Sequence, residues 1–336
     1  MQRTSCACAV AAFAGLLSVA CGGSPTAPSD DTAAGRVLLG QTVRATDGRS
    51  ASNVSVQVGR EQPVTTDADG NFQVAVDGSS SATAVFASGA TVERRTTLRN
   101  GSPDRVRISL IPVSFDLAAF DEMFRASDAG LQRWTTAPRL VIVASVMTYG
   151  TSFTSDFPAT AEQLTDDEVT TMIGHLREGL ALLTGGAYTS FASTDIERPA
   201  AGARVSTTRP ATIVVGRYTG VVTFAQTIGF GEWAVERDGS VSAGAMYLDR
   251  DFDRNDSRRR LLRIHELGHA LGWQHVTSRT SIMNPAIGPE PTDFDRAGAV
   301  IAFQRPPGNR SPDIDPESGA RPVFGLSTAK WHSIRP

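Results

Sequence analysis

Three of the five histidines in the chain lie within eleven residues, at a spacing that suits a metal site. His265 and His269 are four residues apart, so on a helix their imidazoles lie on one face, about 5–6 Å apart, and can bind the same ion. Gly272 allows the helix to end in the left-handed conformation, which can bring His275 back to this ion instead of carrying it about 9 Å further along the axis. Three neutral imidazoles with one water make the open tetrahedral site typical of catalytic zinc.

Glu266 lies between the two helical histidines in the sequence, and its position predicts a role in catalysis. At about 100° per residue, its side chain falls on the same side of the helix as theirs. The other side carries an apolar stripe that can pack against the core, formed by Ile264, Leu267 and Leu271. A bound zinc ion lowers the pKa of its water, and a neighbouring glutamate can accept the proton of that water. The segment therefore predicts hydrolysis through a zinc-activated water, with Glu266 as the general base.

The full spacing H-E-x-x-H-x-x-G-x-x-H is similar to the zinc motif of metzincin metalloproteases. The second hallmark of that clan is a methionine turn beneath the zinc, and Met283 lies in S-I-M-N-P eight residues past His275. This turn resembles the S-I-M-x-P of matrixins, although Val276 stands where matrixins usually have serine. The resemblance covers residues 113–310 and implies a matrixin-like zinc endopeptidase. It implies that the three histidines bind zinc and that Met283 forms an apolar floor without binding it.

The stretch Val221–Thr227 predicts a strand ahead of the zinc-binding helix. Metzincins have an edge strand in this place, so the resemblance implies that a protein or peptide substrate adds to it as a further strand. A helix is predicted after Thr165, which forms the Thr-x-x-Glu spacing of a capping box with Glu168. Helix and mixed strands together predict an α+β fold with a mixed sheet for residues 113–310. The other predicted strands are Arg139–Val146, Thr212–Val215 and Ala243–Leu248.

Further polar residues of this region suit more than one role. Four aspartates precede the zinc-binding helix: Asp249, Asp251, Asp253 and Asp256. They suit a calcium site, because calcium prefers carboxylate oxygens, and they equally suit a solvated loop with a helix cap. The two remaining histidines are too few for the second, structural zinc site of matrixins. We interpret His175 as a surface residue and His332 as part of a C-terminal tail, residues 311–336.

Residues 36–112 alternate apolar and polar side chains in short runs separated by Asp-Gly and Asn-Gly turns. Closely spaced strands without helices predict a small all-β sandwich. The stretch Thr66–Phe72 resembles the T-D-x-x-G-x-F signature of carboxypeptidase-regulatory-like (transthyretin-like) domains. A hairpin turn explains Asp67 and Asp69 better than calcium, because the distal glutamate of an EF-hand loop is missing. We expect this domain to act as a spacer.

The N-terminus predicts export. Residues 1–20 contain one charge and an apolar core too short to span a bilayer, as in a signal peptide. The small residues before Cys21 resemble the lipobox of bacterial lipoproteins, which implies cleavage and lipidation there, with plain secretion as the alternative. Residues 21–35 lack apolar periodicity and are interpreted as a lipidated tether. With the lipid anchor, the expected location is the bacterial cell envelope, at the outer membrane. With plain secretion, the expected location is the medium.

Composition excludes several other classes of protein. The net charge of −3 argues against a nucleic-acid binder that relies on positive charge. All three cysteines lie in the first 21 residues, so the remainder has no disulfide, no cysteine-ligated metal and no cysteine-switch inhibition. The sequence thus predicts a multidomain protein, an all-β sandwich followed by an α+β metzincin-like domain, that acts as an exported zinc endopeptidase. The alternative is a surface-binding lipoprotein whose metalloprotease fold is inactive or very narrowly specific.

Overall fold

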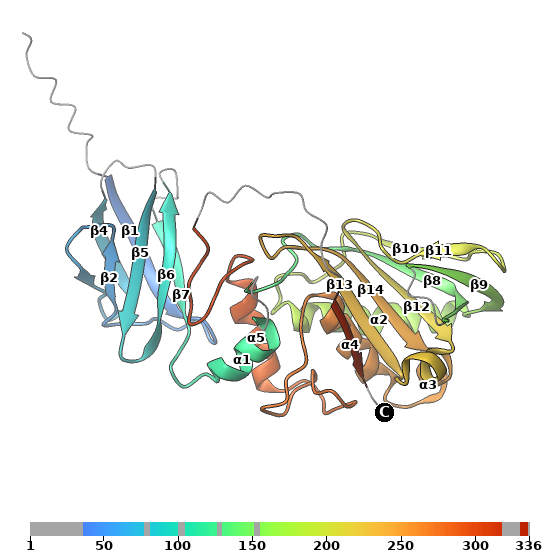
Figure 1. Cartoon of the computed structure of the whole chain (residues 1–336). Helices are drawn as coiled ribbons and strands as arrows, with labels where there is room; N and C mark the ends of the chain where they lie inside the picture. Colours follow the sequence, from blue (N-terminus) through green and yellow to red (C-terminus); the bar gives the residue numbers. More distant parts are fainter. Residues whose placement is uncertain are drawn as a thin grey trace, which may run out of the picture.

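The computed structural model describes residues 36–76, 81–99, 105–125, 130–150, 155–317 and 330–334 (Figure 1). The predicted signal peptide, the lipidation site Cys21 and the tether lie outside the described residues and remain predictions. Within the described part of the chain, none of the helices combines the length and the apolar character needed to span a bilayer.

The N-terminal region is mostly β and consists of two separate sheets with strand orders β4-β1-β7 and β3-β2-β5-β6. The predicted alternation is confirmed in β2, β4 and β7, where every second side chain is turned into one shared apolar core. Val56, Phe86 and Leu110 of this core are fully buried. The strands are β1 (Arg36–Arg44), β2 (Ser55–Val58), β3 (Val64–Thr65), β4 (Asn71–Val76), β5 (Ser81–Ser88), β6 (Thr91–Arg99) and β7 (Arg105–Leu110).

The signature turn between β3 and β4 is held by Asp67. Its carboxylate accepts hydrogen bonds from the backbone N–H groups of Asp69 (2.9 Å) and Asn71 (2.8 Å). Gly70 supplies the left-handed backbone conformation that the turn requires, with φ of +75°. These contacts account for Asp67 as a turn residue.

The second region contains a mixed eight-stranded sheet of order β11-β9-β8-β12-β14-β13-β15, with β10 paired to β8. Strands β10, β8, β12 and β14 run parallel, whereas β9, β13 and β15 pair antiparallel with their neighbours. The strands are β8 (Arg139–Thr148), β9 (Asp156–Gln163), β10 (Thr194–Glu197), β11 (Arg204–Ser206), β12 (Thr212–Thr219), β13 (Gly229–Val235), β14 (Val241–Asp249) and β15 (Lys330–Ile334). Mixed sheet and helices agree with the predicted α+β class.

One face of this sheet packs on helices. Helix α2 begins after Thr165, and the capping box of Thr165 with Glu168 is present as predicted. Its apolar stripe packs against α4, and Gly179 of α2 lies close to Ile264 and Leu267. The opposite face of the sheet carries a separate cluster rich in aromatic side chains. The helices are α1 (Leu117–Phe124), α2 (Asp166–Leu183), α3 (Arg250–Asn255), α4 (Arg259–Ala270) and α5 (Asp293–Phe303).

The predicted strand over Val221–Thr227 is wrong. Val221–Ala225 form a short π-helix, η1, between two left-handed residues, Gly220 (φ +90°) and Gln226 (φ +54°). These two conformations turn the chain away from β12 before the next strand starts at Gly229. The apolar residues of this stretch resemble a strand, but the backbone turns on either side exclude it.

Residues 311–336 are predicted from the sequence to form a tail, and the described parts of this range, 311–317 and 330–334, contribute to both regions. Arg305, just after α5, is fully buried and donates hydrogen bonds to both carboxylate oxygens of Asp313 (2.8 and 2.7 Å). The same guanidinium donates to the carbonyl of Ser109 in β7 (3.0 Å). Arg94 of β6 pairs with Asp315 (3.0 Å). A buried ionic cluster therefore joins the N-terminal sheets to the helical region. Lys330–Ile334 form the outermost strand of the large sheet.

Candidate metal centre

The predicted motif helix is α4, and its C-terminal turn returns the chain toward its own face. Gly272 has φ of +103°, and the N–H of Trp273 donates to the carbonyl of Gly268 (2.9 Å), which closes the helix end. The chain then reverses, so that His275 comes back beside His265 and His269. The predicted role of Gly272 as the helix terminator is confirmed.

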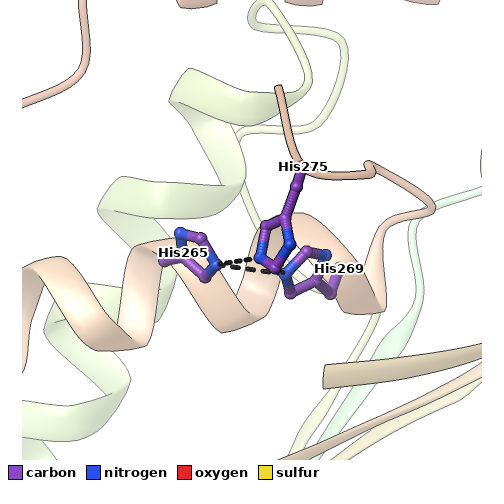
Figure 2. A group of neighbouring side chains, drawn as sticks. All are labelled: His265, His269 and His275. Atoms are coloured by element: carbon purple, nitrogen blue, oxygen red, sulfur yellow. Dashed lines mark hydrogen bonds between the residues drawn. The ribbon is translucent and has the colours of Figure 1, made fainter. Parts of the chain in front are cut away.

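The three imidazoles meet at their Nε2 atoms (Figure 2). The Nε2 atom of His265 lies 3.1 Å from that of His269 and 3.3 Å from that of His275, and the remaining pair is 3.2 Å apart. Nitrogen ligands at about 2.0–2.1 Å from a tetrahedral zinc ion would lie roughly 3.3–3.4 Å from one another. The spacing of these three atoms therefore fits a single zinc ion with one open position.

The other ring nitrogens are tied to backbone carbonyls. His265 Nδ1 donates to the carbonyl of Ile282 (2.6 Å), and His269 Nδ1 donates to that of Trp273 (2.8 Å). Because a carbonyl can only accept, each Nδ1 carries a hydrogen, so in the neutral imidazole the Nε2 atom presents its lone pair. Burial lowers the pKa of His275 to about 4, which favours its neutral form too. The site thus offers three neutral nitrogen donors.

Glu266 lies on α4 with its carboxylate fully buried. Neither carboxylate oxygen has a hydrogen-bond partner among the described residues, and burial raises the pKa of this carboxyl well above its usual value. A buried carboxyl group without hydrogen-bond partners is costly, so its presence here points to a functional role. A Cβ atom at Gly229 of β13 would lie 2.9 Å from Glu266 Oε1. The glycine therefore provides the space that the carboxylate occupies.

A second glycine brings β13 against the same helix. A Cβ atom at Gly231 would lie 2.6 Å from both the backbone oxygen of Glu266 and the Cβ of His269. Two residues further, Trp233 stacks parallel to the His269 ring at 6.4 Å between centroids. Alternate residues of β13 thus face α4, and two of them are glycine because the helix lies so close.

Met283 lies beneath the helix, against Gly268. It is fully buried, and its sulfur would lie 2.6 Å from a Cβ atom at Gly268. Its carbonyl accepts a hydrogen bond from the N–H of Val276 (3.1 Å), the residue after the third histidine. The methionine turn and the His275 segment are therefore held together.

Two residues that support the metal centre, Asp295 and Glu122, were not predicted from the sequence. Asp295 of α5 is buried and accepts from the N–H of Ile282 (3.1 Å) in the methionine turn. Its Thr292-x-x-Asp295 spacing is a capping box, which predicts the helix start but not the contact with Ile282. Glu122 of α1 accepts from the N–H of Thr277 (2.7 Å), two residues past His275. No local pattern marks Glu122, because its partners lie about 155 positions away.

The aspartates before α4 have other partners. Asp249 caps α3, accepting from the N–H groups of residues 251 and 252. Asp253 is fully buried and accepts from Arg217 (2.6 Å) and Arg263 (2.7 Å). Asp251 and Asp256 pair with neighbouring arginines at the surface. Calcium binding by this group stays an untested prediction.

The two remaining histidines lie on α2 and β15, and among the described side chains His175 is not part of the centre's ligand group. His175 is half-buried on α2 and lies 3.1 Å from a guanidinium nitrogen of Arg263. His332 is a residue of β15 rather than of an unpaired tail, and it lies opposite Gly231.

Comparison with known protein families agrees with this geometry. A family model described as Matrixin matches residues 218–310, a segment that contains the three histidines, Glu266 and Met283. No curated protein matches the chain. The match and the histidine triple together support a metalloprotease, and the matrixin family implies a catalytic zinc ion.

Proposed function

We propose that this chain is an exported zinc endopeptidase. The observation that carries the proposal is the convergence of three neutral Nε2 atoms at zinc-ligand spacing, with the unpartnered carboxylate of Glu266 on the same helix. His265, His269 and His275 would hold the ion and leave its fourth position open. When bound, zinc would polarise the scissile carbonyl and make the attacking water acidic.

Glu266 performs the proton transfers in this proposal. A carboxylate oxygen accepts a proton from the water as its oxygen bonds to the carbonyl carbon, and the same group then gives the proton to the amine nitrogen as the C–N bond breaks. The carboxylate has no competing donor among the described residues, so both oxygens are available. The carbonyls of Ile282 and Trp273 hold the imidazoles in place during these steps.

Location is the second part of the proposal. The sequence before residue 36 supports export, cleavage before Cys21 and a lipid anchor on that cysteine. The N-terminal sheets would then lie between the membrane and the zinc site. Cys21→Ala should move the protein from the membrane fraction to the soluble fraction, and unchanged fractionation would refute the anchor.

The activity is tested with the full chain, zinc and a library of quenched fluorescent peptides. We compare it with Glu266→Gln, which preserves the size of the side chain but removes its basicity. The proposal expects cleavage by the parent chain only, with one zinc bound to each protein. If neither protein cleaves although both bind zinc, the chain is better described as a surface-binding lipoprotein with an inactive or very narrowly specific fold.

A further inference from the structure

The outer edge of β13 is already paired, and its partner comes from the same chain. Lys330–Ile334 form β15, which pairs antiparallel with β13 as the outermost strand of the sheet (Figure 1). The register places Ile334 opposite Gly229, His332 opposite Gly231 and Lys330 opposite Trp233. Five consecutive residues therefore pair with the first five residues of β13, Gly229–Trp233.

This edge lies directly beside the candidate metal centre. Gly229 gives space to the Glu266 carboxylate, and Gly231 contacts the helix backbone next to His269. A peptide paired with these two residues would therefore pass alongside the three histidines. Because the inner edge of β13 is paired with β14, an extended peptide can add to this strand only at the outer edge.

We propose that the C-terminal strand Lys330–Ile334 occupies the peptide-binding edge of the metal centre and competes with substrate for it. The inference rests on the proposed function, because it treats β13 as the surface that binds an extended peptide. The occupant is chemically equivalent to that peptide, since both use backbone N–H and C=O groups to add one antiparallel strand.

A tethered competitor has a defined kinetic effect. Because β15 belongs to the same chain, its local concentration does not fall when the protein is diluted. Substrate must displace it, so the full chain has a raised KM, while kcat is unchanged once substrate is bound. A strand that only stabilises the sheet would instead affect unfolding and kcat, without a selective effect on KM.

The first test disrupts the pairing without shortening the chain. The double variant His332→Pro/Ser333→Pro removes two adjacent backbone donors, one of which must face β13 in an antiparallel ladder. The matched control, His332→Ala/Ser333→Ala, removes the same side chains and preserves the backbone donors. We expect KM for a fluorescent peptide to fall roughly tenfold in the proline variant at equal kcat, and to change little in the alanine variant.

The second test measures whether β15 is docked, without relying on activity. Lys330 is the only lysine in the chain, so an endoprotease specific for lysine cuts at one bond, between residues 330 and 331. The assay uses Glu266→Gln as background to prevent self-cleavage, and each rate is divided by that of the same chain in urea. We expect slow cutting in the parent and alanine chains and fast cutting in the proline chain, since a paired strand resists proteolysis.

The two readouts separate the possible outcomes. Protection of Lys330 together with a lower KM in the proline variant supports competition. The inference is overturned if all three chains are cut at equal rates. It is also overturned if Lys330 is protected but KM is the same in the proline and alanine variants. In both cases, cleavage of the peptide would still support the proposed function. If no variant cleaves peptides although zinc is bound, the proposed function fails, and the inference fails with it.

Discussion

His265 and Asp295 are joined through the backbone of Ile282. The carbonyl of Ile282 accepts from His265 Nδ1 (2.6 Å), and its N–H donates to a carboxylate oxygen of Asp295 (3.1 Å). Asp295 also accepts from the N–H of Thr292 (2.7 Å), at the start of α5. The orientation of the first histidine therefore depends on a helix that lies outside the zinc motif.

Asp295→Asn should weaken metal binding. Both N–H groups, of Ile282 and of Thr292, donate to the Oδ2 atom, and a neutral amide oxygen in its place is a weaker acceptor than a charged carboxylate oxygen. Loss of such an outer contact typically lowers metal affinity by about 10–100-fold, which competition with a chelator measures. Asp293→Asn, an exposed change in the same helix turn, is the control. Equal zinc affinity in both variants would show that Asp295 does not orient His265.

Gly229→Ala should lower turnover without removing zinc. The added methyl group would lie 2.9 Å from Glu266 Oε1, so the flexible carboxylate must move, while the histidines keep their positions. Misplacement of a reacting group by an ångström can cost up to about 100-fold in rate, which steady-state kinetics would show as a fall in kcat. Gly231→Ala provides a contrast, because its methyl group meets the helix backbone and should instead reduce thermal stability. Unchanged kcat in Gly229→Ala would contradict the proposed position of the base.

Met283→Ala should destabilise the fold. The side chain is fully buried beneath α4 at Gly268, so its loss leaves a cavity below the zinc-binding helix. Such a truncation costs about 2–5 kcal/mol of unfolding free energy, measured by urea denaturation. Met283→Leu, which retains most of the volume, should cost less than about 1.5 kcal/mol. A loss of zinc in Met283→Leu with unchanged stability would indicate a more direct role.

Asp253→Asn should be strongly destabilising. The buried carboxylate accepts from Arg217 and Arg263, and its neutralisation leaves two buried guanidinium groups without their shared counterion. Breaking a buried ion pair in this way costs roughly 3–5 kcal/mol of unfolding free energy, whereas the exposed control Asp251→Asn should change it by less than about 0.5 kcal/mol.

We also expect added calcium to leave the melting temperature of the parent chain unchanged, since both Asp253 oxygens already accept hydrogen bonds from arginines. A calcium-dependent rise in melting temperature would instead support the calcium site that the sequence predicts for these aspartates.

The lowered pKa of Glu122 means that the folded protein should lose stability in acid. Burial alone raises the pKa of Glu122, but hydrogen bonds from Ser278 and Thr277 outweigh it and lower the pKa from 4.5 to about 2. A lowered pKa in the folded state means that Glu122 stabilises the fold above pH 4.5 and that this contribution disappears as the pH falls toward 2.

Glu122→Gln should therefore reduce stability at neutral pH and flatten the decline below pH 4.5. Urea unfolding at a series of pH values measures both effects. Part of the decline should remain in the variant, because the pKa of Glu168 is also lowered to about 2, by Arg217 and Thr165 against the effect of burial. Parallel stability curves for the parent and the variant would contradict the assigned contacts of Glu122.

Sequence alone was sufficient for the parts of this protein that depend on local geometry. The histidine spacing on α4, the left-handed Gly272 and the capping box at Thr165 each involve residues within a few turns of one another. The helix repeat and the steric freedom of glycine act over that range, so the pattern of residue types is enough to predict the result. The alternating strands β2, β4 and β7 follow from a period of two for the same reason.

Only the tertiary structure decided the surroundings of the site. Asp295 and Glu122 reach the metal centre from α5 and α1, and β15 reaches β13 from near the end of the chain. The glycines of β13 weaken its strand pattern, so the sequence favoured Val221–Thr227 instead, where the structure has a π-helix. These features depend on which distant segments approach closely enough to bond, and no periodicity within a single segment encodes that approach.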